Sequence, residues 1–238
     1  MKEQVRAWVR AARRIVLLSG AGMSAESGVP TFRDAQTGLW ANFRPEELAT
    51  EQAFRADPQR VWDWYALRRE KLAQVEPNAG HRAIAAFQQR HPGRLTVVTQ
   101  NVDGLHQRAG SPGVLALHGN LAEDQWLDAP RACCDAALLQ AGRPPRCPTC
   151  GNLRRPAVVW FGELLPQRAF AQAEEAAAAC ELMLVVGTSG AVYPAAGLAR
   201  TTPGRVVIVN PGPTELDDAA DAVLAGTAAA LLPELLED

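Results

Sequence analysis

Residues suited to acid–base chemistry stand where short apolar segments of the chain end. His118 follows the apolar segment Val114–Leu117. Asn101 and Asp103 follow Leu95–Gln100. A neutral imidazole can accept a proton near neutral pH, which is typically worth about 10²–10⁴ in rate. Asn and Asp can orient a ligand or a water, although the same pair is also a common helix cap. The pattern indicates a candidate base accompanied by candidate orienting groups.

A glycine-rich loop follows another apolar segment, Ile15–Ser19, with Gly20 and Gly22 directly after it. Two glycines in this place allow a tight turn and let backbone N–H groups approach a phosphate. Gly28 comes too late for the GxGxxG spacing of ordinary dinucleotide-binding enzymes. A structural turn therefore explains the glycine pair equally well.

Segments of strand length alternate with longer amphipathic segments along most of the chain. Such alternation predicts an α/β fold, here a Rossmann-like doubly wound parallel sheet. The expected strands are Ile15–Ser19, Leu95–Gln100, Val114–Leu117, Ala157–Phe161, Leu182–Val186 and Arg205–Val209, and the expected helices are Glu3–Arg14, Pro58–Gln74, Asn78–Arg90 and Pro166–Cys180. Parallel sheets place ligands at the carboxyl ends of their strands, where the polar residues named above lie, together with Gly187–Ser189 and Asn210.

Four of the five cysteines stand within residues 121–155, where the sequence predicts no long strand or helix. This segment is expected to be a small inserted module. A structural zinc ion could be held there by Cys133, Cys134, Cys147 and Cys150. Adjacent cysteines do not easily point at one ion, so a metal-free module held by Trp126, Leu127 and the prolines is the alternative.

The composition is that of an ordinary globular protein. The chain has 238 residues, of which 47% are hydrophobic and 21% charged, and its net charge is −2. These values exclude a disordered or fibrous chain, and neither nucleic acid nor a membrane is an expected partner. No apolar run reaches the roughly 18 residues of a membrane span. We expect a monomeric, cytoplasmic protein without a disulfide framework.

Five motifs together resemble the fingerprint of one enzyme family. Gly20–Arg33 reads GAGMSAESGVPTFR, close to the sirtuin pattern GAGxSxxSGIPTFR, and Thr99–His106 reads TQNVDGLH. LHGN at Leu117–Asn120, VVWFGE at Val158–Glu163 and GTS at Gly187–Ser189 follow in the family's order. The chain therefore resembles the sirtuins, which are NAD-dependent protein-lysine deacylases. Their reaction yields nicotinamide, free lysine and 2′-O-acyl-ADP-ribose.

The resemblance assigns roles to the residues that match the motifs. It implies that His118 and Asn101 are catalytic, with His118 as the base that takes a proton from a ribose hydroxyl. It implies an NAD site formed by Gly20, Ala21, Gly22, Glu26, Thr31, Phe32, Arg33, Trp40, Gln100, Asn101, Asp103, Gly187, Thr188, Ser189, Asn210 and Ala228. It implies a site for an acyl-lysine protein or peptide formed by Tyr65, Arg68, Val158, Trp160, Phe161, Gly162 and Val192. Sirtuins usually bind structural zinc through two CxxC pairs, of which only Cys147–Cys150 is present here.

Tyr65 and Arg68 lie three residues apart in a predicted helix and therefore share one face. Taken alone, Tyr65 belongs to a core stripe and Arg68 pairs with Glu70 or another acid. In the sirtuin branch that removes succinyl and malonyl groups, a Tyr-x-x-Arg at this place holds the acyl carboxylate. A guanidinium matches a carboxylate bidentately, so we expect desuccinylase or demalonylase activity above deacetylase activity. Protein ADP-ribosylation and a non-catalytic NAD-binding module are the alternatives.

Under this interpretation residues 1–238 form one catalytic domain. Its large NAD-binding part is expected to comprise about 1–34, 76–120 and 156–238. A small helical insertion over about 35–75 and the cysteine module over about 121–155 complete the domain.

Overall fold

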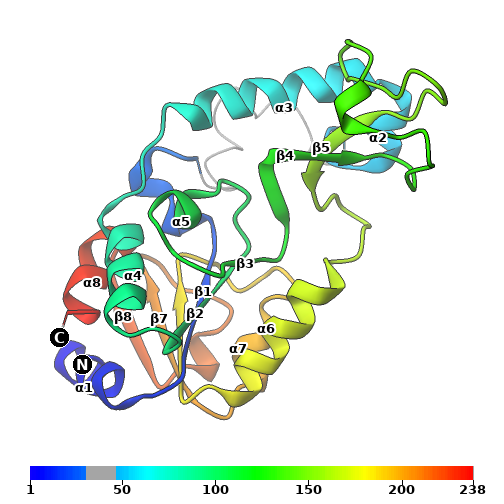
Figure 1. The fold of residues 1–238 in the computed structure, drawn as a ribbon. Coiled ribbons are helices and arrows are strands. Elements are labelled where there is room, and N and C mark those ends of the chain that lie inside the picture. Colours follow the sequence, from blue (N-terminus) through cyan, green and yellow to red (C-terminus); the bar gives the residue numbers. More distant parts are fainter. Residues whose placement is uncertain (31–46, 238) are drawn as a thin grey trace.

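A six-stranded parallel sheet forms the centre of the larger part of the molecule (Figure 1). The computed structural model describes residues 1–30 and 47–237. The strands lie in the order β3-β2-β1-β6-β7-β8, and every neighbouring pair is parallel. Their bounds are β1 (Ile15–Ser19), β2 (Leu95–Thr99), β3 (Leu115–Ala116), β6 (Leu182–Val186), β7 (Arg205–Asn210) and β8 (Ala222–Ala225). The strand order reverses between β1 and β6, which confirms the predicted doubly wound α/β architecture.

Successive residues of each central strand face opposite sides of the sheet, and both sides are apolar. Ile15 and Leu17 of β1 pack in one core with helices α1 (Lys2–Ala11), α4 (Ala79–Arg90) and α8 (Ala228–Leu235). Val16 and Leu18 pack in a second core with α6 (Gln167–Ala179) and α7 (Gly197–Thr201). A strand covered on both faces reads as a continuous apolar run, which explains the segment IVLL.

The carboxyl ends of β1 and β6 approach each other through glycine backbone. Gly20 donates its N–H to the carbonyl of Val186 at 2.9 Å, and Gly22 donates to the carbonyl of Gly187 at 2.8 Å. A Cβ atom on Gly187 would lie 2.3 Å from the nitrogen of Met23, and its φ is +62°. A side chain at this position would collide with Met23 and would strain the left-handed backbone, so only glycine fits. The first glycine loop is thereby locked onto the loop after β6, at the point where the strand order reverses.

A smaller layer stands at the other end of the molecule from the sheet (Figure 1). It consists of α2 (Glu51–Ala56), α3 (Pro58–Ala73) and an antiparallel pair, β4 (Gly119–Trp126) and β5 (Arg154–Val158), while the short α5 (Leu105–Arg108) follows β2. The hydroxyl of Thr50 caps α2, and the carboxylate of Asp57 caps α3 ahead of Pro58. Both are common helix starts, since the side chain satisfies an N–H that the first turn leaves open.

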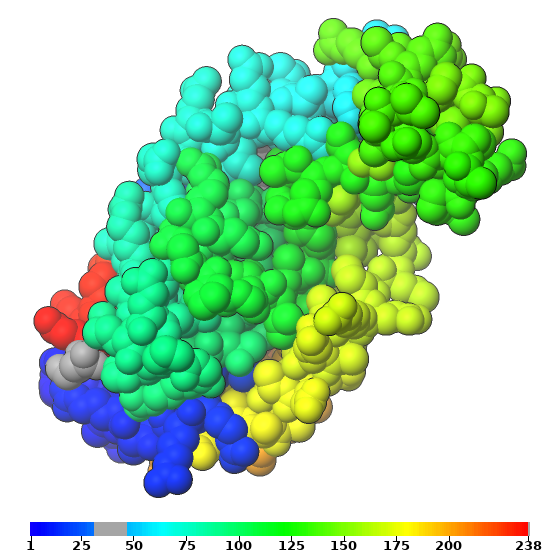
Figure 2. Space-filling model, in the orientation of Figure 1, coloured from blue at the N-terminus to red at the C-terminus, as the bar shows by residue number. Residues whose placement is uncertain are grey.

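A separate apolar core holds this smaller layer together. It is formed by Leu48, Phe54, Val61, Tyr65, Leu121, Val158 and Trp160. The chain between β4 and β5 carries four cysteines and forms a lobe at one end of the molecule (Figure 2). The layer is thus built from segments that lie far apart in the sequence.

The predicted elements of the large sheet are found, with small shifts at their ends, but predictions for the smaller layer need correction. The expected strand Ala157–Phe161 is wrong: β5 covers Arg154–Val158 and pairs antiparallel with β4. The chain turns after β5, because the N–H of Trp160 donates to the side chain of Glu163 and not to a strand. β4 lies partly in the segment where no strand was expected, since its sequence is polar and gives no apolar pattern. Across residues 1–30 and 47–237, no helix combines the length and apolarity needed to cross a membrane.

Alanine substitution at two glycines with the same φ of +62° tests the close approach between the loops. Gly113→Ala should cost about 1 kcal/mol, because the left-handed backbone is strained but nothing lies within 4 Å of the new Cβ. Gly187→Ala should cost about 4 kcal/mol or more, because the same strain is joined by a collision with Met23. Chemical denaturation measures both free energies. Equal costs would contradict the interlocked loops.

Candidate active site

His118 lies directly before β4 and contacts the loop that follows β2. Its Nδ1 lies 2.8 Å from the backbone carbonyl oxygen of Gln100. A carbonyl oxygen can only accept, so Nδ1 carries the ring proton and Nε2 keeps its lone pair. Among the described residues, no hydrogen-bond partner occupies Nε2. Burial lowers the pKa of His118 below its ordinary value of 6.5, against the opposing effect of the Gln100 bond. The ring is therefore neutral at pH 7, and Nε2 can accept a proton.

Asn101 is held by its amide nitrogen, which leaves its carbonyl oxygen open. Nδ2 donates to the carbonyl of Gly20 at 3.0 Å and to Ser24 Oγ at 3.2 Å. The backbone N–H of Asn101 donates to Thr99 Oγ1 at 3.0 Å. Because the Gly20 carbonyl only accepts, the amide nitrogen must face it. Oδ1 then has no partner in the part of the chain described, and it offers an acceptor at the same edge of the sheet.

Asp103 is buried, and both of its carboxylate oxygens accept hydrogen bonds from the protein. Oδ2 accepts from Ser24 Oγ at 2.7 Å, and Oδ1 accepts from the N–H of Leu105 at 2.9 Å. The second bond is an Asx-type contact to the first residue of α5, while Gly104 occupies the N-cap position without a side-chain cap bond, so the predicted helix cap is not formed in its usual geometry. Burial raises the pKa of Asp103, while these two bonds act against that rise. Ser24 joins Asp103 to Asn101, and no role was predicted for it although it stands in the glycine motif itself.

A buried group of polar side chains, which was also not predicted, holds the backbone of Asn101 on the side of the core. Ser19 Oγ donates to Thr99 Oγ1 at 2.8 Å and lies 2.9 Å from Nε2 of His106. The rings of His106 and His81 are 4.8 Å apart. Burial lowers the pKa of His106 to about 3 and that of His81 to about 4, so both rings are neutral at pH 7. Thr99, which binds the backbone of Asn101, is thus fixed by a chain of hydrogen bonds that starts in the core.

The glycine loops bring several of the predicted NAD residues together. Gln100 Nε2 lies 3.4 Å from Thr188 Oγ1 and so connects the ends of β2 and β6. The N–H of Gly20 is bonded to the last residue of β6 and that of Gly22 to the first residue after it, so these two amides do not face a phosphate as expected. The glycines serve the contact between the loops instead. This contact lies at the reversal of strand order, where doubly wound sheets bind dinucleotides, so the residues fit NAD.

The other predicted NAD residues are more widely spread. Asn210 ends β7, and its Nδ2 donates to the carbonyl of Gly212 at 2.7 Å. Glu26 accepts the N–H of Ala229 at 2.8 Å and so caps α8, whose first residue, Ala228, is buried. Ser189 is exposed next to Thr188. The predicted residues Thr31, Phe32, Arg33 and Trp40 lie outside the described residues.

The predicted substrate segment, Val158–Glu163, runs from β5 past His118. Its second residue donates a backbone hydrogen bond of 2.9 Å to the carbonyl of His118. Its first residue is buried in the core of the smaller layer, whereas the side chain of Phe161 is 56% exposed. Gly162 has φ +87° and turns the chain. Val192, in the loop after β6, is 48% exposed. Phe161 and Val192 therefore both present apolar surface to solvent.

Tyr65 and Arg68 lie together on α3 beside the same segment. Tyr65 is 2% exposed, and its hydroxyl oxygen accepts the indole N–H of Trp160 at 2.9 Å. The guanidinium carbon of Arg68 lies 5.4 Å from the centre of the Tyr65 ring and 4.7 Å from that of Trp64. Within residues 1–30 and 47–237 Arg68 pairs with no carboxylate, so the expected ion pair with Glu70 is not found. Burial lowers the pKa of Arg68, but arginine remains charged at neutral pH.

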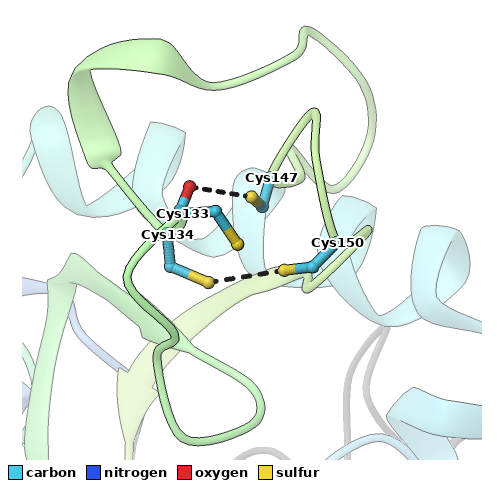
Figure 3. A group of neighbouring side chains, drawn as sticks. All are labelled: Cys133, Cys134, Cys147 and Cys150. Carbon is cyan, nitrogen blue, oxygen red and sulfur yellow. Dashed lines mark hydrogen bonds between the residues drawn. The ribbon is translucent and has the colours of Figure 1, made fainter.

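The four clustered cysteines converge on one point in the lobe between β4 and β5 (Figure 3). The sulfur atoms of Cys133, Cys134, Cys147 and Cys150 all lie within 4.8 Å of one another. Cys134 Sγ and Cys150 Sγ are 3.5 Å apart, and Cys147 Sγ donates to the carbonyl of Cys133 at 3.0 Å. Tetrahedral zinc with Zn–S bonds of about 2.3 Å places its sulfurs about 3.8 Å apart. The arrangement fits a structural zinc ion, and adjacent cysteines are no obstacle to it here.

The chain is similar to known proteins along nearly its whole length. Residues 20–194 match the Sir2 family. The chain is 58% identical over 236 residues to an NAD-dependent protein deacylase of Ralstonia nicotianae, covering 98% of this chain and 95% of that protein. It is 52% identical to NAD-dependent protein deacylase 1 of Pseudomonas aeruginosa, covering 94% of each.

Solved structures give the same result for the fold. A Sir2 homologue in complex with NAD is similar with a TM-score of 0.86 at 40% identity, covering 99% of this chain and 93% of that one. Sir2Tm bound to a propionylated peptide is similar with a TM-score of 0.82 at 31% identity, covering 98% and 96%. At identities of 40% and 31%, the similarity extends to the family as well as to the fold.

Metal analysis of the purified protein tests the cysteine site. We expect about one zinc ion per chain, because four thiolates at this spacing bind it tightly. Cys147→Ser should lose the metal and lower the unfolding temperature. Cys180→Ser is the matched control, since Cys180 is buried elsewhere beside Thr202, and it should retain the zinc. Purified protein without metal, or a Cys147→Ser variant that keeps it, would contradict the assignment.

Proposed function

Because the chain belongs to the Sir2 family and is an NAD-dependent protein deacylase, we propose that its preferred substrates are lysines carrying succinyl or malonyl groups. One observation carries this proposal. Arg68 lies half-buried beside the buried phenol of Tyr65, and in the described part of the chain it has no carboxylate partner. Deacetylation is then the minor activity.

The preference follows from what a half-buried guanidinium requires. A charge withdrawn from water is costly unless an opposite charge and hydrogen bonds replace the water. The carboxylate of a succinyl or malonyl group supplies both to Arg68, in bidentate geometry. The methyl of an acetyl group supplies neither. The difference in binding therefore lies in one ion pair and the hydrogen bonds that accompany it.

We assign NAD binding to the loops at the carboxyl ends of the parallel strands. NAD supplies the ADP-ribose to which the acyl group is transferred. The backbone of Gly20–Gly22 and the loop Gly187–Ser189 form the contact at the reversal of strand order, and Gln100 bridges to it. Asn210 at the end of β7 and Ala228 at the start of α8 extend the site toward the far edge of the sheet.

His118 acts as the base in this proposal. Its Nε2 takes a proton from a ribose hydroxyl, and the Gln100 carbonyl holds the N–H at Nδ1 in both protonation states. This bond keeps the ring in one orientation and stabilises the cation that forms. Asn101 Oδ1 orders a water or a ribose hydroxyl next to it.

The substrate peptide lies between Val158–Gly162 and the loop that contains Val192. The exposed side chains of Phe161, Leu164 and Val192 offer apolar contacts to such a peptide. The backbone link between residue 159 and His118 then keeps the peptide segment at a fixed distance from the base.

Matched acyl peptides test the substrate preference. The wild-type kcat/KM should be higher for a succinyl peptide than for the acetyl peptide of the same sequence. Arg68→Met should lower the succinyl value about 10- to 100-fold, because a hydrogen bond to a charged group is worth about 1.5–3 kcal/mol. The acetyl value should stay within about twofold.

Arg60→Met is the matched control, since Arg60 is an exposed arginine on the same helix. It should leave both values unchanged. A wild-type enzyme without succinyl preference, or a preference that survives Arg68→Met, would overturn the proposed specificity while leaving deacylase activity itself in place.

The pH dependence tests the base. His118→Ala should lower kcat about 10²–10⁴-fold on every acyl peptide. The base must be neutral, and burial lowers the pKa of His118 below 6.5, so wild-type kcat/KM should fall toward acidic pH with a midpoint below pH 6.5. A decline centred above pH 7 would show that another group limits the reaction.

A further inference from the structure

The hydrogen bond between Trp160 and Tyr65 has only one possible direction. An indole nitrogen is a donor and never an acceptor, and Nε1 of Trp160 lies 2.9 Å from the Tyr65 hydroxyl oxygen. The phenol oxygen therefore accepts, and the proton of Tyr65 must point elsewhere. For that proton the described residues provide no acceptor. Burial raises the pKa of Tyr65 above its ordinary value of 10.0, so the phenol keeps the proton at neutral pH.

The indole ring is itself held in place on several sides. Trp160 is 2% exposed, and its ring centre lies 5.3 Å from that of Phe54. The guanidinium carbon of Arg155 lies 3.4 Å from the ring centre of Trp160. Arg155 forms a salt bridge with Glu163, which also accepts the backbone N–H of Trp160 at 2.8 Å. The direction of the indole N–H is therefore set by the protein before any substrate binds.

We infer that Trp160 is a positioning residue that determines acyl specificity: by occupying the acceptor side of the Tyr65 hydroxyl, it directs the phenol proton toward a carboxylate held beside Arg68. This inference rests on the proposed preference for succinyl and malonyl groups and adds a residue to it. Tyr65 and Arg68 then form a pair of fixed donors with an acceptor missing, which an acyl carboxylate provides. Without the indole N–H, the phenol proton rotates freely and only Arg68 remains oriented.

Trp160→Phe removes the N–H and keeps an aromatic ring in the core. The probes are a succinyl peptide and a butyryl peptide, which has the same chain length with a methyl in place of the carboxylate. The ratio of their kcat/KM values should fall about tenfold, because a hydrogen bond to a charged group is lost. The change should lie in KM for the succinyl peptide, with kcat within about twofold, because the contact is far from the bonds that react.

A double-mutant cycle asks whether Trp160 acts through Tyr65. Tyr65→Phe alone should also lower the succinyl to butyryl ratio. In that background Trp160→Phe should change the ratio by less than about twofold, because the hydroxyl that it orients is gone. Phe54→Leu is the control for packing, since Phe54 contacts the same indole but makes no hydrogen bond to Tyr65. It should lower stability and leave the ratio unchanged.

Where Trp160→Phe does not fold, a tryptophan isostere with sulfur in place of the ring N–H, incorporated at position 160, keeps the shape and removes the donor. It should give the same tenfold fall.

The outcomes separate this inference from the proposed function. A ratio that falls in Arg68→Met but not when the indole N–H is removed would overturn the role of Trp160 and leave the substrate preference standing. Independent, multiplying effects of Trp160→Phe and Tyr65→Phe would overturn it as well. A wild-type enzyme with no preference for the succinyl over the butyryl peptide would overturn both.

Discussion

The hydrogen bond from the indole of Trp160 to the phenol of Tyr65 joins the two segments between which the acyl group would lie. Tyr65 belongs to α3, and Trp160 belongs to the segment that follows β5, so the bond fixes the distance between a helix and a turn. Both residues lie in the core of the smaller layer, where apolar packing holds them without any ligand. The same turn is bonded through residue 159 to the backbone of His118. One short segment thus fixes the position of Trp160 and Tyr65 relative to His118, and in the proposed mechanism it would keep the acyl group aligned with the base.

At the carboxyl ends of β1 and β2, where we propose that NAD binds, backbone carbonyls orient His118 and Asn101. The carbonyl of Gln100, after β2, decides which nitrogen of His118 carries the proton. The carbonyl of Gly20, after β1, decides which end of the Asn101 amide faces the protein. β1 and β2 are neighbours in register, with Ser19 opposite Thr99, so the sheet itself determines which side-chain atoms remain free. Acceptor atoms left free in this way, Nε2 and Oδ1, are those that a base and an orienting group need.

Much of the large sheet could be predicted because each of its strands has a recognisable pattern within its own few residues. Continuous apolar runs identify strands covered on both faces, and polar residues directly after them identify the functional edge. The smaller layer gave no such signal: the strand Gly119–Trp126 is polar, and it exists because it pairs with a strand about 30 residues further along the chain. Ser24, the His81–His106 pair and the bond between Trp160 and Tyr65 were missed for the same reason. Each depends on contacts between distant segments, which motif spacing does not describe. The adjacent cysteines show the reverse case, in which a spacing that looked unfavourable still brings four sulfurs together.

A crystal structure with a succinyl-lysine peptide bound would show whether Tyr65 and Arg68 both donate hydrogen bonds to the acyl carboxylate. We expect succinyl oxygens within about 3 Å of both the Tyr65 hydroxyl and the Arg68 guanidinium, with the indole N–H of Trp160 still bonded to the phenol oxygen. A structure in which Arg68 is paired with a carboxylate of the protein, and the succinyl group lies elsewhere, would contradict this expectation.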